Sequence, residues 1–323
     1  MAAKPRLWTR GFVLDTLVNF LIYIIYYMLM VIIASEAIHS LNASVSEAGL
    51  ASGLFVLGTL VARLFAGRSV ELYGRKKMLY AGILFYLVTT CMYFLVDSLP
   101  MMYGVRLLNG VGYGIASTAT STIVSAMIPA ERRGEGINYY ALSMSLAAAI
   151  GPFIGMLLQQ MFPFSVIILF SIAMVLVCLA AAFVMKVDEI QLTEEHRAAL
   201  KQLSLSNFLE PRVMGISIVG FFVAVCYSSV LSFLATYAAE LQLMTAGTLF
   251  FVVYALSITL ARPVAGVMFD RKGEDFVMYP TYACLAIGLL VLSITTRTGK
   301  CWWPVCSWAW ATEPSCLTAR PSA

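Results

Sequence analysis

The sequence predicts an all-α polytopic membrane protein, and its composition, its apolar runs and the placement of its cations each point to that class. Of the 323 residues, 61% are hydrophobic and 12% are charged, and the mean hydropathy is +0.87. Soluble domains average about 45–50% apolar and about 25% charged residues, so this composition excludes a soluble globular domain and a disordered chain. The period-2 alternation of a membrane β-barrel is absent, and a net charge of +4 is too small to indicate a nucleic-acid partner.

Nine apolar runs are long enough for transmembrane helices, each of which needs about 20 residues. They cover residues 11–35, 46–66, 78–96, 101–126, 137–161, 164–186, 213–237, 244–265 and 276–296. Lys and Arg occur in the N-terminal tail and then in every second loop, and they are absent from the loops between until Arg297 and Lys300. Because cations favour the cytoplasmic side, this alternation predicts a cytoplasmic N-terminus.

The ends of the second and eighth runs resemble each other. Four positions recur at a single offset of 199 residues: Arg63, Gly67, Glu71 and Gly74, followed by Arg262, Gly266, Asp270 and Gly273. Two halves related by a repeat are typical of transporters, in which the substrate path lies between the halves.

The pattern G-x-x-x-[DE]-x-x-G-R-[RK] that begins at Gly67 resembles the signature loop of the major facilitator superfamily, with Glu71 where Asp is usual. The resemblance covers residues 1 to about 296. It implies two bundles of six helices that rock against each other in alternating access. The weaker copy of the pattern after the eighth run and the long polar loop after the sixth run fit the same family.

This resemblance divides the chain into four parts. We expect a complete six-helix N-terminal bundle at 1–186, a cytoplasmic linker at 187–212 with a short surface helix at 194–203, and three helices of a C-terminal bundle at 213–300. The remaining residues, 301–323, hold four of the five tryptophans and no glycine.

The tail at 301–323 is predicted to be out of frame. Tryptophan has a single codon, so part of the alternative frame can be deduced. It places glycines at 309 and 311, which lie 199 residues beyond Gly110 and Gly112, the same offset as in the loop repeat. A truncated transporter remnant without transport activity is therefore an alternative to an active transporter for the chain as written.

The signature loop is predicted to form a cytoplasmic gating motif with its repeat. Gly67 and Glu71 share a helix face, where the glycine permits another helix to approach closely. Gly74 permits a sharp reversal into the next helix. The alternative is that the cluster only sets the topology. The motif comprises Gly67, Glu71, Gly74, Arg75, Lys76, Gly266, Asp270 and Gly273.

Arg106 lies inside the fourth run, and a charge within a membrane span is costly and marks a functional site by default. Together with Asn109, Gly110 and Gly112, it resembles the helix-four motif of drug/proton antiporters, in which the arginine is associated with proton coupling. The alternative is an arginine that snorkels to the outer surface. Glu36 matches the depth of Arg106 in the membrane.

Asp15 and Asn19, one turn apart in the first run, are further candidates for proton coupling or for the cavity wall, although Asp15 could instead be a rim carboxylate beside Arg10. In the fifth run, the sequence resembles the core of the antiporter motif of drug-efflux families and predicts a kink with a tight helix contact, through Gly151, Pro152 and Gly155. Five tyrosines either line a cavity or only pack: Tyr23, Tyr26, Tyr27, Tyr139 and Tyr140.

The sequence contains no Walker-type phosphate loop, no nucleophile–base pair and no metal-ligand cluster. We therefore predict neither an enzyme nor a protein with a cofactor. We expect a monomeric secondary active transporter of a bacterial inner membrane, with lipid, a small-molecule substrate and protons as partners. Proton-coupled export of small molecules is the leading hypothesis, and a nutrient or metabolite carrier of the same family is the alternative.

Overall fold

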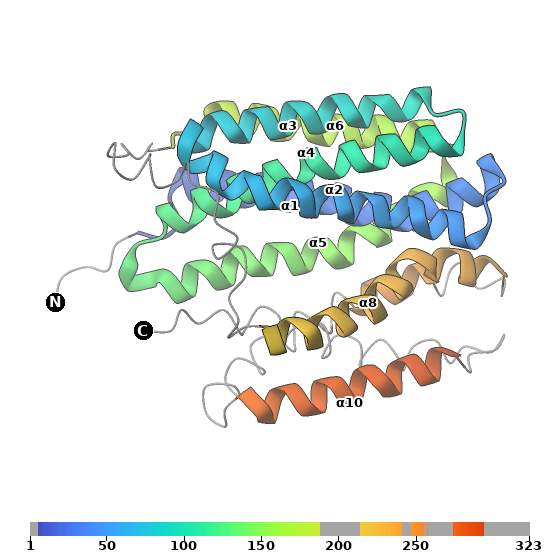
Figure 1. The fold of residues 1–323 in the computed structure, drawn as a ribbon. Coiled ribbons are helices and arrows are strands. Elements are labelled where there is room, and N and C mark those ends of the chain that lie inside the picture. Colours follow the sequence, from blue (N-terminus) through green and yellow to red (C-terminus); the bar gives the residue numbers. More distant parts are fainter. Residues whose placement is uncertain (1–5, 188–213, 241–246, 255–256, 258–273, 294–323) are drawn as a thin grey trace.

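The computed structural model describes residues 6–187, 214–240, 247–254, 257 and 274–293. Long helices run side by side in this part of the chain, and no strand occurs in it (Figure 1). The elements are α1 (Arg10–Leu41), α2 (Val45–Tyr73), α3 (Arg75–Cys91), η1 (Met92–Leu95), α4 (Leu99–Met127), η2 (Ala130–Arg132), α5 (Arg133–Met161), α6 (Phe164–Val184), α8 (Met214–Glu240) and α10 (Glu274–Ser293). Residues 247–254 are also helical.

Six of the described helices are long and apolar enough to cross a membrane by length and composition. The predicted all-α polytopic class is therefore confirmed. α4 is not among the six, because glycines, hydroxyl side chains and Arg106 make it less apolar than its neighbours. We call α1–α6 the first bundle. The predicted surface helix at 194–203 and the tail at 301–323 lie outside the described residues.

Polar residues set the helix ends, and α1 and α2 continue well past the C-terminal ends of their apolar runs. Thr9 accepts a hydrogen bond from the Phe12 backbone N–H at the start of α1. Ser44 and Glu47 form a capping box at the start of α2. α1 continues to residue 41 and α2 to residue 73, beyond the predicted ends at 35 and 66. The predicted spans end too early because hydropathy detects only the part of a helix inside the apolar layer of the membrane. The backbone hydrogen bonds of both helices continue beyond that layer.

Glycines bring the helices of the first bundle into close contact. α4 packs between α2 and α3, and α1 packs against α5 and α6. A Cβ added to Gly110 would lie 2.1 Å from the Phe55 carbonyl oxygen of α2, and one added to Gly112 would lie 2.8 Å from the Tyr86 backbone of α3. Only glycine permits such contacts, so α4 is fixed on both sides by its own small residues.

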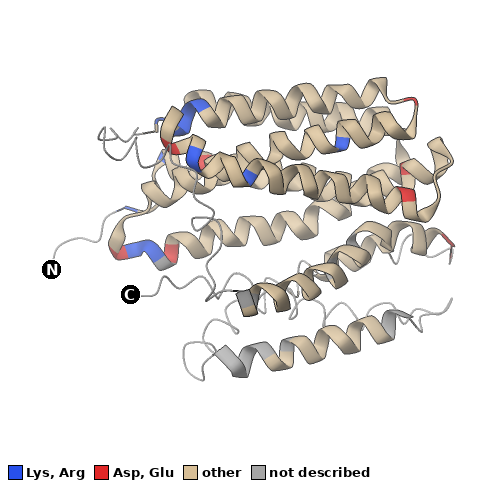
Figure 2. Ribbon diagram, in the orientation of Figure 1, with Lys and Arg blue, Asp and Glu red and all other residues tan. Residues whose placement is uncertain are grey.

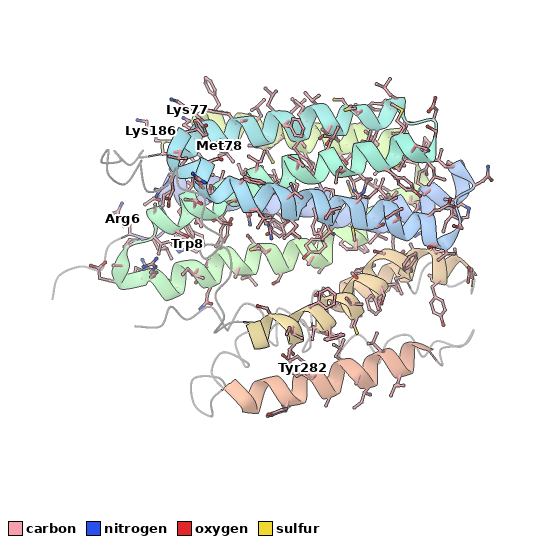
Figure 3. The ribbon with its side chains drawn as sticks, viewed as in Figure 1. Arg6, Trp8, Lys77, Met78, Lys186 and Tyr282 are labelled. Atoms are coloured by element: carbon pink, nitrogen blue, oxygen red, sulfur yellow. The ribbon has the colours of Figure 1, made fainter. Side chains whose placement is uncertain are left out.

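One end of the first bundle is basic. It is formed by the C-terminal end of α2, the start of α3 and the connection between α4 and α5. Figure 2 shows most of the Lys and Arg gathered there, and Figure 3 places the labelled side chains of Arg6, Lys77 and Lys186 at the same end. We call this the basic end. It contains Arg68, Arg75, Lys76, Lys77, Arg132 and Arg133.

Candidate functional site

The predicted gating motif lies at the basic end, where α2 turns into α3. Gly74 has φ 100° and ψ 138°, a conformation that favours glycine, so the predicted reversal occurs at this residue. α3 begins at Arg75, the next residue. The Lys76 Nζ donates hydrogen bonds to the carbonyl oxygens of Met185 at 2.7 Å and Phe183 at 3.5 Å. Lys76 therefore satisfies carbonyl groups at the C-terminal end of α6, a contact that the sequence did not predict.

Gly67 and Glu71 are both exposed on α2. Nothing lies within 4 Å of a Cβ built on Gly67, so the predicted close approach of another helix is not found among the described residues. Glu71 also has no partner here, since no described residue forms an ion pair or hydrogen bond with it. The repeat residues Gly266, Asp270 and Gly273 lie outside the described part of the chain.

Arg106 is fully buried inside the first bundle, with 0% exposure. Its Nε donates to the Ala51 carbonyl oxygen at 3.2 Å, and its Nη1 donates to the Tyr93 hydroxyl at 3.4 Å. Its Nη2 lies 3.7 Å from the Met30 sulfur, and its Cζ lies 4.5 Å from the centre of the Phe55 ring. The side chain therefore does not snorkel to the surface in this structure.

No carboxylate pairs with Arg106 within the described part of the chain. Glu36, which matches its depth in the sequence, accepts a hydrogen bond from the Ser40 hydroxyl at 2.7 Å instead. Equal depth does not give two side chains the same direction around the bundle, so the Glu36 pairing suggested by the sequence is not formed. The partners of Arg106 within the described residues are all electrically neutral.

Asn109 and the glycines of the helix-four motif contact the neighbouring helices α2 and α3. The Asn109 Nδ2 donates to the hydroxyl groups of Thr89 and Thr90 on α3, each at 3.1 Å. Gly110 and Gly112 form the close contacts with α2 and α3 described above. These three residues hold α4 in place, and Arg106 is the member of the motif that carries charge.

An aromatic cluster lies between α1, α2 and α4. Tyr26 stacks on Phe55 with ring centroids 5.2 Å apart, and its ring lies 5.0 Å from that of Tyr113. Tyr23 lies 5.5 Å from Tyr113, and Tyr27 lies 4.6 Å from Tyr26. We define the aromatic cluster as these five residues. Tyr139, another sequence candidate, is not part of it and packs on Trp8 instead, at 4.9 Å.

The aromatic cluster lies between two arginines. Tyr26 is in electrostatic contact with both Arg106 and Arg63, and Arg63 is also in contact with Tyr23 and Tyr113. The sequence identifies Arg63 only as part of the repeat. A charged residue inside the apolar run at 46–66 could have indicated a functional role for Arg63. The direction of its side chain, however, depends on how α2 is rotated about its axis.

A buried polar cluster lies nearer the basic end, between α1, α4 and α5. The Asn19 Nδ2 donates to the Ser143 hydroxyl at 3.4 Å, and the Thr120 hydroxyl donates to the Asn19 Oδ1 at 3.4 Å. The Tyr140 hydroxyl donates to Thr120 at 3.1 Å. Asn19 thus joins three helices, which the sequence did not predict.

Asp15 lies one turn from Asn19 on the same face of α1 and is 0% exposed. Neither of its carboxyl oxygens has a hydrogen-bond partner among the described residues. It is in electrostatic contact with Tyr140. The alternative of a rim carboxylate beside Arg10 is therefore not what the structure contains, since Asp15 is enclosed by the bundle.

The helix-five motif packs against α1. A Cβ on Gly151 would lie 2.9 Å from the Ile24 carbonyl oxygen, and one on Gly155 would lie 3.1 Å from that of Met28. Pro152 is buried within α5. The predicted tight contact is present, and it places α5 directly behind the tyrosines of α1.

Apolar helices that enclose buried charges and hydrogen-bonded polar groups are typical of membrane transport proteins, because such groups are retained in a membrane for function. The profile of the Major Facilitator Superfamily matches residues 16–312. The chain belongs to this superfamily, whose members are transporters and not enzymes. The match extends into the segment 301–323, for which an out-of-frame reading stays a prediction.

The relatives by sequence are distant. An uncharacterized MFS-type transporter of Methanocaldococcus jannaschii is 24% identical over 263 residues, which cover 80% of this chain and 68% of that protein. Multidrug resistance protein 2 of Bacillus subtilis is 24% identical over 268 residues, which cover 79% of this chain and 65% of that protein. This chain thus spans about two thirds of the length of these two relatives.

Solved structures share the fold. The crystal structure of a D-xylose–proton symporter has a TM-score of 0.69 at 13% identity and covers 95% of this chain and 81% of that one. The crystal structure of the nucleoside transporter NupG has a TM-score of 0.71 at 12% identity and covers 93% of this chain and 79% of that one. At these identities the likeness shows the fold alone.

Proposed function

We propose that the protein exports small amphiphilic organic molecules in exchange for protons, by alternating access, as a monomer in a bacterial inner membrane with its N-terminus in the cytoplasm. The concentration of Lys and Arg at one end of the first bundle supports this orientation. Bacterial relatives named multidrug resistance proteins support export. In this proposal residues 1–186 are the N-terminal bundle, 187–212 the linker and 213–300 part of the C-terminal bundle.

Asp15 is the observation that carries the proposal of proton coupling. Its carboxyl group is fully buried and has no hydrogen-bond donor or cation among the described residues. An ionised carboxylate in such a place costs several kcal/mol, and a bound proton removes that cost. Opening of the bundle to water would remove the penalty and release the proton. Asp15 is therefore suited to bind and release a proton as the two bundles rock.

A hydrogen-bonded polar cluster lies one helical turn from Asp15, around Asn19. The hydroxyl groups of Tyr140 and Thr120 and the amide of Asn19 are already linked by hydrogen bonds. All three lie on helices of the same bundle, so a change in packing at α1 would reach Asp15 directly. In this proposal Asn19 positions the neighbouring groups and Asp15 holds the proton.

The signature loop is proposed to act as the gate at the basic end. Lys76 ties the start of α3 to the end of α6, and Gly74 fixes the reversal between α2 and α3. Glu71 is exposed on the same segment and is free to pair with a group that approaches in another state of the cycle. Breaking and forming such a pair would couple the gate to the rocking motion.

Proteoliposomes that contain the purified chain test the proposal. A pH gradient is imposed, and the movement of three probes is followed: naphthalene-2-sulfonate, trimethyl(2-naphthyl)ammonium and D-xylose. The two naphthalene probes keep their charge at every pH, so passive redistribution does not mimic transport. Exchange for protons moves a naphthalene probe toward the acidic side, and a protonophore abolishes this movement.

Movement of xylose toward the alkaline side would support the nutrient-carrier alternative instead. If no probe responds to the gradient, while circular dichroism shows folded helices, the proposal of proton-coupled transport is wrong. Asp15→Asn provides the internal comparison, since it keeps the shape of the side chain and removes the proton-binding group.

A further inference from the structure

Two arginines lie on the inner face of the first bundle with no acidic partner among the described residues. Arg106 contacts one carbonyl oxygen, one hydroxyl, one sulfur atom and one aromatic ring, all of them neutral. Arg63 contacts tyrosines and forms no ion pair with any described residue. Arginines in membrane spans usually pair with an anion or face a water-filled path. In the part of the chain that the structure describes, the positive charge of two arginines around one cluster is therefore uncompensated.

The carboxylates of the described spans are far from this cluster. Along α1, Asp15 lies eleven residues before Tyr26 and Glu36 lies ten residues after it, which is about 15 Å in either direction at the rise of an α-helix. α4 carries no acidic residue at all. The remaining described carboxylates are close to helix ends or in loops: Glu47, Glu71, Asp97, Glu131, Glu135 and Glu240.

The aromatic cluster offers a ligand both ring surface and access. Phe55 and Tyr113 are buried, whereas Tyr26 and Tyr27 are half-buried and Arg63 is exposed. The cluster is thus open on the side of α1 and α2. Tyr26 and Tyr27 also pack against a buried apolar cluster that includes Val230 and Leu234 of α8, at the boundary between the first bundle and α8. Substrates of transporters built from two repeats bind at this boundary.

The same geometry disfavours a cation. Aromatic rings can bind cations through their faces, but the Phe55 ring already has the Arg106 guanidinium 4.5 Å from its centre. A second cation beside Tyr26 would be repelled by Arg106 and Arg63 together. An anion would be attracted by both and would supply the missing counter-charge.

We propose that the site takes an aromatic or amphiphilic organic anion, which stacks on the aromatic cluster beside Tyr26 and pairs with Arg63 and Arg106. This inference rests on the proposed function, because it names the class of substrate for the same path. Arg63 makes the first contact, since it is exposed, and Arg106 holds the charge within the bundle. A sulfonate, carboxylate or phosphate group provides the same chemistry here.

Equilibrium binding to the purified chain in neutral detergent tests the inference without transport. Naphthalene-2-sulfonate and trimethyl(2-naphthyl)ammonium carry the same ring and opposite permanent charges. We expect the sulfonate to bind roughly tenfold or more tightly than the ammonium compound. Arg63→Gln should remove most of this difference by weakening the sulfonate alone.

Arg68→Gln is the matched control, because Arg68 lies on the same helix, five residues on, away from the aromatic cluster. It makes the same change in net charge and should leave the preference intact. Equal binding of the two probes, tighter binding of the ammonium compound, or equal effects of the two variants would overturn the inference. The binding and transport assays test different claims. Preference for the anion without proton-driven movement contradicts only the proposed proton coupling. Proton-driven movement of the ammonium compound contradicts only the inference that the substrate is an anion.

Discussion

Asp15 and Arg106 are both fully buried in the first bundle, but their surroundings differ. The Arg106 guanidinium is held by a carbonyl oxygen and a ring of α2 and by a hydroxyl of η1. Neither oxygen of Asp15 has a hydrogen-bond partner among the described residues. Arg106 is therefore a fixed positive charge, for which we propose an anionic partner. Asp15 is a group whose charge can change with little disturbance to its neighbours.

The largest effect is expected from Gly110→Ala, which should damage the Arg106 site and spare the Asp15 site. The new methyl group would lie 2.1 Å from the Phe55 carbonyl oxygen, so α2 and α4 must separate. Overpacking of this kind costs about 1–3 kcal/mol or more. Thermal unfolding in detergent should show the loss, and sulfonate binding should weaken because Ala51 and Phe55 move away from Arg106.

Gly104→Ala is the control for that substitution. Gly104 lies on the same helix, and nothing lies within 4 Å of a Cβ built on it. Its replacement should leave unfolding unchanged or slightly raise the stability, since Ala favours helix by about 1 kcal/mol. Equal destabilisation by the two variants would show that the α2–α4 contact is not as close as described.

Arg106→Lys should have the next largest effect. Lys retains the charge, but it cannot donate from two directions to Ala51 and Tyr93 as the guanidinium does. Lost hydrogen bonds to a buried charge cost about 1.5–3 kcal/mol. We expect weaker sulfonate binding and impaired proton-driven transport, with insertion into the membrane intact. Unchanged binding would indicate that Arg63 alone provides the positive charge.

Tyr93→Phe isolates a single contact of the arginine. The hydrogen bond from Arg106 Nη1 is long, at 3.4 Å, so its removal should lower the stability by only about 1 kcal/mol. Sulfonate affinity should change little, because the charge stays in place. A loss as large as that in Arg106→Lys would mean that the tyrosine itself is part of the binding site.

Much of the fold follows from the sequence, because the length of each apolar run matches the thickness of the membrane and helix breakers mark the ends of the helices. The reversal at Gly74 and the close contacts of Gly151 and Gly155 also follow from local residue size. Which side chains pair with each other around the bundle does not follow from the sequence. Glu36 and Arg106 share a depth but not a direction, and the position of Arg63 beside Tyr26 depends on the rotation of α2. A single sequence gives no measure of that rotation.

The sequence likewise did not predict that Asp15 is buried. Hydropathy places Asp15 near the N-terminal end of the first run, where an exposed carboxylate beside Arg10 would be ordinary. The contacts of α4 and α5 with α1 enclose it instead. The polar cluster around Asn19 has the same origin, since Thr120, Tyr140 and Ser143 come from two other helices.

Asp15→Asn should have the smallest effect on stability, within about 1 kcal/mol, because the amide replaces a group that has no ionic partner in the described part of the chain. Its effect on coupling should be complete. Asn cannot bind and release a proton, yet the arginines that hold the anion are untouched. Binding of naphthalene-2-sulfonate should equal that of the unmodified protein.

The most direct test is to compare two transport modes in proteoliposomes of this variant. One is exchange of labelled for unlabelled naphthalene-2-sulfonate without a gradient, and the other is movement driven by a pH gradient. If Asp15 carries the proton and the arginines carry the anion, Asp15→Asn retains exchange and loses the gradient-driven movement. Gradient-driven movement that survives in Asp15→Asn at the level of the unmodified protein would contradict this account.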